Sequence, residues 1–136
     1  MQLKGSFTSD CQWQPKDYCK GTCYVDLTDN DVFHGAKGRI RIDYDADSKF
    51  QPPMLIPRPL PSMPVTVERL LDNEFSVIVT TSWFSLAPWE KVFDLIGLSV
   101  RFTFDHKTKA FEGTYHVNGG MGIPRDAGRF VSIQDN

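Results

Sequence analysis

Hydrophobic and polar residues alternate one by one over several short stretches of this chain, which is the periodicity of a β-strand with one buried face. The clearest stretch is Gly38 to Asp45, where the apolar side chains all face the same side. Leu98 to Asp105 and Ala110 to Val117 flank a short polar turn and predict a hairpin. Less regular stretches predict five further strands: Leu3 to Thr8, Thr22 to Leu27, Val65 to Leu71, Glu74 to Trp83 and Arg129 to Ile133.

Two segments depart from this alternation. Between Ser85 and Leu95 the apolar residues recur at helical spacing, with Ser85 as a candidate N-cap, so we expect one short helix that plugs an end of the sheet. Gln51 to Pro64 holds six prolines, which cannot donate hydrogen bonds within a sheet. We expect a long surface loop here, and a lid or a docking segment for a partner is the alternative.

The number and length of these elements predict an all-β fold, a single small antiparallel β-barrel of about eight strands with one short helix, in one domain spanning residues 1–136. Closure into a barrel removes the unpaired edge strands that would otherwise promote aggregation. With eight strands, the interior is either filled by side chains or holds one small ligand.

The net charge and the short apolar runs argue against two kinds of partner, nucleic acids and membranes. The formal net charge of −2 and the isoelectric point of about 5.9 provide no basic surface for nucleic acid, so we expect no nucleic-acid partner. The uninterrupted apolar runs fall far short of the roughly 20 residues that cross a bilayer. Because the first residues also do not resemble a secretory signal, we expect no membrane partner and a cytoplasmic location.

The three cysteines, Cys11, Cys19 and Cys23, lie close together in the sequence, but their spacing is not that of paired zinc knuckles. An odd number also argues against a complete set of disulfides. We expect free thiols, no metal and no cofactor, and a zinc site that adds His34 is the alternative. Nucleophile-elbow, P-loop, dinucleotide-binding and HExxH motifs are all absent from the sequence.

The predicted hairpin carries the candidate catalytic residues. If Asp105 opposes Ala110, then Arg101, Glu112 and His116 share one face of the two strands. Two interpretations of this face remain open. It is a solvated outer surface, or it lines a pocket in which Glu112 and His116 act as an acid/base pair and Arg101 binds an anion or a carbonyl.

The opposite face of the hairpin is aromatic and provides the candidate ligand-binding residues. Apolar cavities are lined by large rigid side chains with a few polar groups for orientation. The fourth candidate catalytic residue, Tyr115, is expected to offer its hydroxyl to a substrate carbonyl from this face. The candidate ligand-binding residues are Trp83, Trp89, Phe102 and Phe104.

Gly113 to Val131, GTYHVNGGMGIPRDAGRFV, resembles the closing segment of dirigent and allene oxide cyclase-like barrels. That segment typically carries a strand, then Gly-Gly-Thr-Gly, an apolar residue, Phe-Arg-x-Ala-Arg-Gly and an aromatic residue. The positions that match are Gly119, Gly120, Gly122, Ile123, Arg125, Ala127 and Phe130. The departures are Met121 in place of Thr, Pro124 in place of Phe, and Gly128-Arg129 in reversed order.

The resemblance implies an eight-stranded antiparallel barrel whose cavity folds an apolar, reactive substrate so that it cyclises or couples with one stereochemistry. Such a protein acts mainly by holding the substrate in a reactive geometry, commonly as a homo-oligomer. No catalytic residue can be transferred, because the matching stretch contains none of the family's acid or base positions. We therefore expect a cyclase- or isomerase-type enzyme of biosynthesis. The alternative is a non-catalytic barrel that binds a ligand, or a protein partner through residues 51–64.

Overall fold

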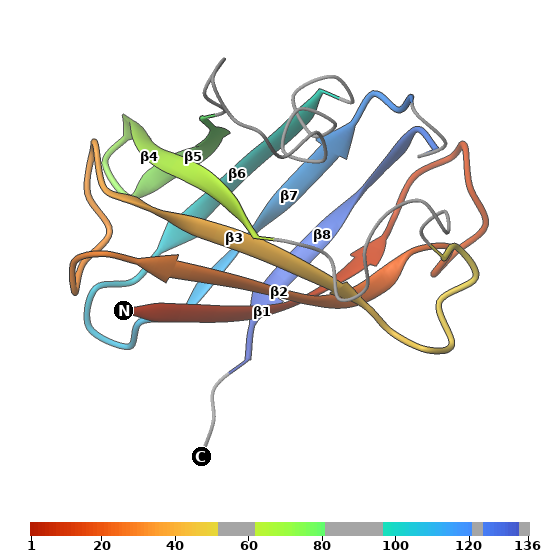
Figure 1. Cartoon of the computed structure of the whole chain (residues 1–136), viewed down its shortest axis with the longest axis horizontal. Coiled ribbons are helices and arrows are strands. Elements are labelled where there is room, and N and C mark those ends of the chain that lie inside the picture. The colour runs from red at the N-terminus through yellow and green to blue at the C-terminus, as the bar shows by residue number, and fades with distance from the viewer. Residues whose placement is uncertain (52–61, 81–96, 121–123, 134–136) are drawn as a thin grey trace.

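In the computed structural model, which describes residues 1–51, 62–80, 97–120 and 124–133, the chain forms a closed barrel of eight antiparallel strands (Figure 1). The strands are β1 Gln2–Ser9, β2 Lys20–Leu27, β3 Lys37–Tyr44, β4 Met63–Leu71, β5 Glu74–Val79, β6 Leu98–Phe104, β7 Phe111–Val117 and β8 Asp126–Ser132. Each strand pairs with the next along the chain, and β8 pairs with β1. The expected all-β barrel is confirmed. The described residues contain no helix, and so none that could cross a membrane.

The hairpin of β6 and β7 has the predicted register. Arg101 lies opposite Thr114, and Ser99 lies opposite His116. The turn is fixed by Asp105, whose carboxylate accepts hydrogen bonds from the backbone N–H groups of Lys107 at 2.8 Å and Thr108 at 3.3 Å. An Asp side chain that bonds the backbone in this way favours a turn over a continued strand.

Several strand boundaries differ from the sequence-based prediction, most of them by one or two residues. β4 begins at Met63 and includes Pro64, which is tolerated because it lies at the start of the strand. β5 ends at Val79, and most of the predicted extension to Trp83 lies outside the described residues. β8 begins at Asp126. The predicted start was three residues later, because Gly128 and Asp126 carry no apolar side chain and so conceal the alternation. The predicted helix from Ser85 to Leu95 and the proline positions 52–61 lie outside the described residues.

The barrel interior is built from one face of every strand. Phe104, Met63, Val65 and Val67 are among the most deeply buried side chains of the described residues. The loop between β2 and β3 adds Val32, which is also buried and closes one end of the barrel. Alternating burial along β1, β4 and β8 shows the expected period of two.

Four strand glycines bring the backbones of neighbouring strands close together. A Cβ atom at Gly21, Gly38, Gly113 or Gly128 would overlap a backbone oxygen of the adjacent strand. Glycine therefore permits the tight coiling that a small closed barrel requires.

We expect Gly128→Ala to destabilise the barrel by about 1–3 kcal/mol, since an added methyl group would overpack this site. The new Cβ would overlap the Thr8 carbonyl oxygen and lie 2.7 Å from the Tyr115 hydroxyl oxygen. Thermal unfolding measures the effect. Val131→Ala, an exposed substitution on the same strand, should cost less than about 0.5 kcal/mol. Equal melting temperatures for Gly128→Ala and the parent protein would contradict this account.

Candidate functional site

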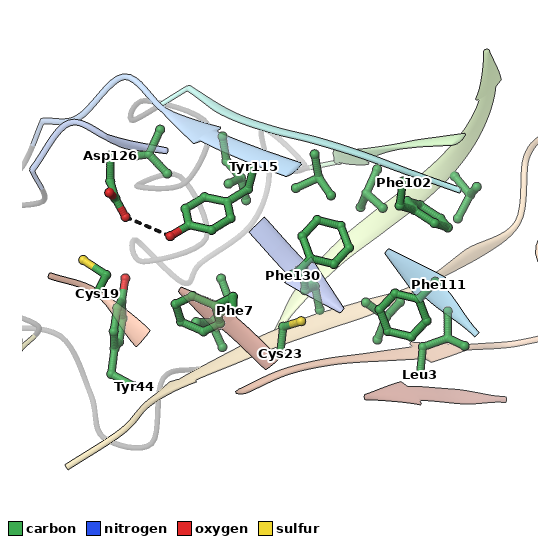
Figure 2. Close-up of a pocket in the computed structure, with 18 of the residues that line it drawn as sticks. Leu3, Phe7, Cys19, Cys23, Tyr44, Phe102, Phe111, Tyr115, Asp126 and Phe130 are labelled. Atoms are coloured by element: carbon green, nitrogen blue, oxygen red, sulfur yellow. Dashed lines mark hydrogen bonds between the residues drawn. The ribbon is translucent and has the colours of Figure 1, made fainter. Parts of the chain in front are cut away.

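The barrel encloses a cavity of about 110 Å³ to which all eight strands contribute side chains. Most of these side chains are aliphatic or aromatic, including Phe7, Phe102, Phe111 and Phe130 (Figure 2). Asp126 is the single charged residue among the described residues that line the cavity. The cavity therefore combines apolar walls with one carboxylate.

Asp126 is only 4% exposed and is held by side chains that donate hydrogen bonds to it. The Ser9 hydroxyl lies 2.9 Å from both carboxylate oxygens. The Tyr115 hydroxyl donates to Oδ2 at 3.0 Å (Figure 2), and the Cys11 thiol lies 3.6 Å from Oδ1. A buried carboxylate needs such donors because it has lost its hydration shell.

Strand pairing explains why these residues meet although they are distant in sequence. β8 lies between β1 and β7, so Asp126 on β8 has Ser9 on one side and Tyr115 on the other. Ser9 is fixed in turn by the backbone N–H of Cys19, which donates to its hydroxyl oxygen at 2.9 Å. The resulting Ser9–Asp126–Tyr115 cluster spans three adjacent strands.

Burial and the Asp126 charge keep the neighbouring acidic groups protonated. Burial, followed by the Asp126 charge, raises the pKa of the Cys19 thiol to about 12. The same two causes raise the pKa of the Tyr115 hydroxyl. Burial is also the main cause that raises the pKa of the Tyr44 hydroxyl. At neutral pH these groups are therefore hydrogen-bond donors, not anions.

The Tyr44 hydroxyl has no hydrogen-bond partner among the described residues, although Tyr44 lines the cavity. Its ring packs edge-on against Phe7 at 5.7 Å and against Phe50 at 5.5 Å between ring centroids. Figure 2 shows Tyr44 and Cys19 at the same end of the cavity as Asp126. Tyr44 therefore provides a donor that is free to bind a ligand.

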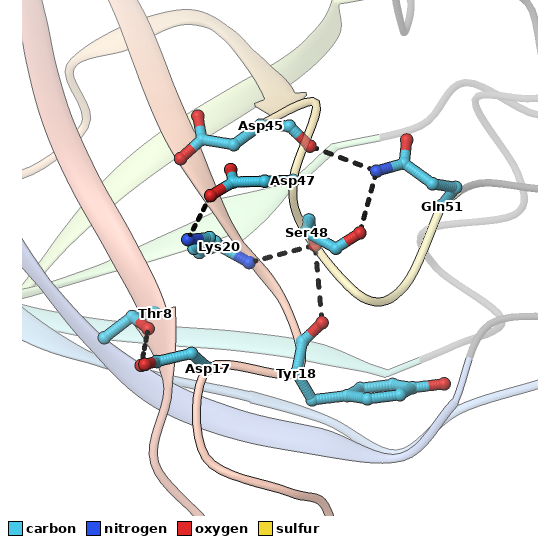
Figure 3. A network of polar contacts seen from close by, with 8 residues as sticks. All are labelled: Thr8, Asp17, Tyr18, Lys20, Asp45, Asp47, Ser48 and Gln51. Carbon is cyan, nitrogen blue, oxygen red and sulfur yellow. Dashed lines mark hydrogen bonds and ion pairs between the residues drawn. The ribbon is translucent and has the colours of Figure 1, made fainter.

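A polar network outside the cavity holds this end of the barrel together (Figure 3). The backbone N–H of Phe50 donates to the Tyr18 carbonyl at 2.9 Å, and the buried Ser48 hydroxyl donates to the same carbonyl at 3.3 Å. Lys20 forms an ion pair of 2.7 Å with Asp47. These contacts fix the loop after β3 so that Phe50 lies against the cavity.

The structure separates the sequence-predicted site residues into two groups. Tyr115 and Phe102 line the cavity. Arg101 and Glu112 lie exposed on the outer face, where Arg101 forms an ion pair of 3.0 Å with Glu74. His116 contacts the ring of Trp13 on the same outer side, and the two ring centroids are 5.9 Å apart.

Of the remaining candidates, only some lie among the described residues. Phe104 is 2% exposed and belongs to the core, but it is not among the residues that line the cavity. Trp83 and Trp89 lie outside the described residues. The three cysteines are free thiols, and His34 accepts a hydrogen bond from the Arg69 backbone N–H at 3.1 Å. Within the described ranges, no three His, Cys, Asp or Glu side chains gather to hold a metal ion.

Sequence reasoning missed Asp126, Ser9 and Tyr44 as a group. The alternation that places Phe130 inside the barrel also places Gly128 and Asp126 inside, so extending the last predicted strand by three residues would have identified the carboxylate. Extending the first predicted strand by one residue would likewise have placed Ser9 on the same face as Leu3 and Phe7.

No family model, curated protein or solved structure matches this chain. The fold and the site therefore define the class of protein, a closed eight-stranded antiparallel β-barrel whose described interior is mostly apolar and includes the buried carboxylate of Asp126. The resemblance of residues 113–131 to dirigent and allene oxide cyclase-like barrels agrees with the architecture and assigns no family.

Proposed function

We propose that this barrel binds a small, mostly apolar molecule in its interior and acts on it as a cyclase- or isomerase-type enzyme. The observation that carries the proposal is the carboxylate of Asp126, which lies in an otherwise apolar cavity and is hydrogen-bonded to Tyr115. A titratable group and a few polar side chains that converge in an apolar pocket are typical of ligand-binding and active sites.

Asp126 is the group that would accept a proton from the substrate. Its electrostatic effect is larger here than in water because the apolar walls lower the local dielectric constant. Tyr115 is a positioning residue, since its hydroxyl donates to Asp126. The Tyr44 hydroxyl would donate to a substrate oxygen on which negative charge develops.

The walls of the cavity would provide the other part of catalysis. Packed aromatic rings, such as Phe7 against Tyr115 at 5.8 Å, restrict the conformations of a bound molecule. Holding a substrate close to its reactive geometry lowers the barrier to an intramolecular reaction. The cavity of about 110 Å³ is smaller than the roughly 300 Å³ of a typical drug-sized site, so it encloses only a compact molecule or one part of a larger one.

A test that needs no knowledge of the natural substrate uses cyclopentanone in deuterated water. We expect the protein to accelerate exchange of the protons beside the carbonyl group, because Asp126 takes the proton and returns deuterium after exchange with solvent. Asp126→Asn should reduce the enzyme-dependent rate by about a hundredfold or more. Tyr115→Phe should reduce it less, because it disturbs the position of Asp126 and leaves the carboxylate in place. Proton NMR or mass spectrometry follows the exchange.

The matched control is Glu112→Gln, which removes an exposed carboxylate from the outer face of β7 and should leave the rate unchanged. Exchange that persists in Asp126→Asn would refute the proposed role of Asp126. Binding of cyclopentanone without any acceleration would favour the alternative function, a non-catalytic ligand-binding barrel.

A further inference from the structure

Among the described residues, no cation balances the negative charge inside the cavity. Among the described residues that line the cavity there is no Lys, Arg or His. The two arginines nearest in sequence to Asp126 are engaged elsewhere. Arg125 stacks on the Trp13 ring at 3.6 Å, and Arg129 forms an ion pair of 2.9 Å with Asp10.

The hydrogen bonds to Asp126 solvate its charge but do not neutralise it. Ser9, Tyr115 and Cys11 are uncharged donors with one proton each. The Cys19 thiol is a further uncharged partner of Asp126, so neutral donors occupy most of the roughly four acceptor positions of the carboxylate. A buried charge that is hydrogen-bonded but not paired with a counter-ion still carries a desolvation cost that a cation would offset.

The aromatic side chains at this end of the cavity favour positive charge as well. The rings of Phe7, Tyr44 and Tyr115 pack edge-to-face, with Phe7 5.7 Å from Tyr44 and 5.8 Å from Tyr115. The face of an aromatic ring carries partial negative charge and attracts cations. Figure 2 shows these rings at the end of the cavity where Asp126 lies.

We propose that the cavity selects apolar molecules that carry a positively charged group, such as a protonated amine, and rejects apolar carboxylates. The inference rests on the proposed function and specifies its substrate class. The charged group pairs with Asp126, and the hydrocarbon part occupies the apolar side of the cavity beyond Phe7.

Three cyclopentyl compounds that differ mainly in charge test this proposal on the unmodified protein. They are cyclopentylamine, cyclopentanol and cyclopentanecarboxylate, titrated at pH 7 and followed by shifts in the NMR spectrum. We expect the amine to bind about tenfold more tightly than the alcohol. The carboxylate should not bind measurably, because its charge and that of Asp126 repel each other in a buried site.

Asp126→Asn removes the charge while keeping the size and the ability to accept hydrogen bonds. In this variant the amine should lose its advantage over the alcohol. Asp10→Asn is the matched control, since it removes an exposed carboxylate of the outer surface and should leave the preference unchanged. Because the comparison of three probes uses the parent protein, the test holds even if Asp126→Asn does not fold.

The outcomes separate the two proposals. If the alcohol binds as tightly as the amine, or the carboxylate binds as tightly as the alcohol, the charge preference is wrong and the ligand-binding function stands. A preference that survives in folded Asp126→Asn also overturns the inference. If none of the three compounds binds, the proposed function itself fails.

Discussion

Raising the pH above about 9 should progressively destabilise this barrel, because burial raises the pKa values of four groups in its interior. The pKa of Cys19 rises to about 12 and that of Cys23 to about 11, and the pKa values of Tyr44 and Tyr115 also rise. In the unfolded chain the thiols ionise near pH 9.0 and the phenols near pH 10.0. The unfolded state therefore releases protons first, and stability that is complete below about pH 9 is lost as the pH rises towards 12.

Each group that ionises only in the unfolded state removes roughly 1 kcal/mol of stability for each pH unit. The four groups together should remove several kcal/mol by pH 11, a large part of the stability of a domain of this size. Denaturant unfolding measured from pH 7 to pH 11 provides the test. Tyr44→Phe and Cys23→Ala should each make the decline less steep, whereas Tyr24→Phe, on the outer face, should not. A free energy of unfolding that stays constant up to pH 11 is the result that would refute the prediction.

Replacing Phe104 with Ala should destabilise the barrel by about 3–5 kcal/mol, because it leaves a cavity in the core. The side chain is 2% exposed and is among the largest fully buried side chains of the described residues. Chemical denaturation measures the loss. Phe33→Ala is the matched control: Phe33 is 41% exposed, so the cost should remain below about 1 kcal/mol.

A milder substitution at the same position tests whether Phe104 belongs to the core or to the ligand site. Phe104 was expected from the sequence to bind a ligand, but it does not line the cavity. In Phe104→Leu, which retains more of the core volume, cyclopentanol should bind as it does to the parent protein. A clear loss of cyclopentanol affinity in a folded Phe104→Leu variant would place Phe104 in the binding site.

The strands were predictable where one face is consistently apolar. In β3 and β6 every second residue is apolar, and this period alone gives the position and the inward face of each strand. The β6–β7 register followed from the short polar turn that Asp105 fixes. Closure into a barrel was predictable because an open sheet of many short strands would leave the backbone groups of its two edge strands unpaired.

The candidate site was only partly predictable, because it depends on contacts between distant parts of the chain. The Ser9 hydroxyl and the Asp126 carboxylate are 117 positions apart in sequence, and no local pattern links them. Local pairing did place Arg101, Glu112 and His116 on one face, yet a polar strand face has the same composition whether it borders solvent or a pocket. Only the assembled barrel distinguishes these cases, and here the polar face lies outside.

The β1–β8 pairing has a consequence for how the protein becomes functional during folding. Seven of the eight strand pairings join neighbours in sequence and can form as local hairpins, whereas β1 and β8 come from opposite parts of the chain. Bringing distant segments together carries the largest loss of chain entropy, so this pairing is the natural late step of assembly. Ser9 and Asp126 lie on the two strands that meet in that step. A partly assembled chain can thus have most of its hairpins and still lack the site, which makes ligand binding a direct report of barrel closure.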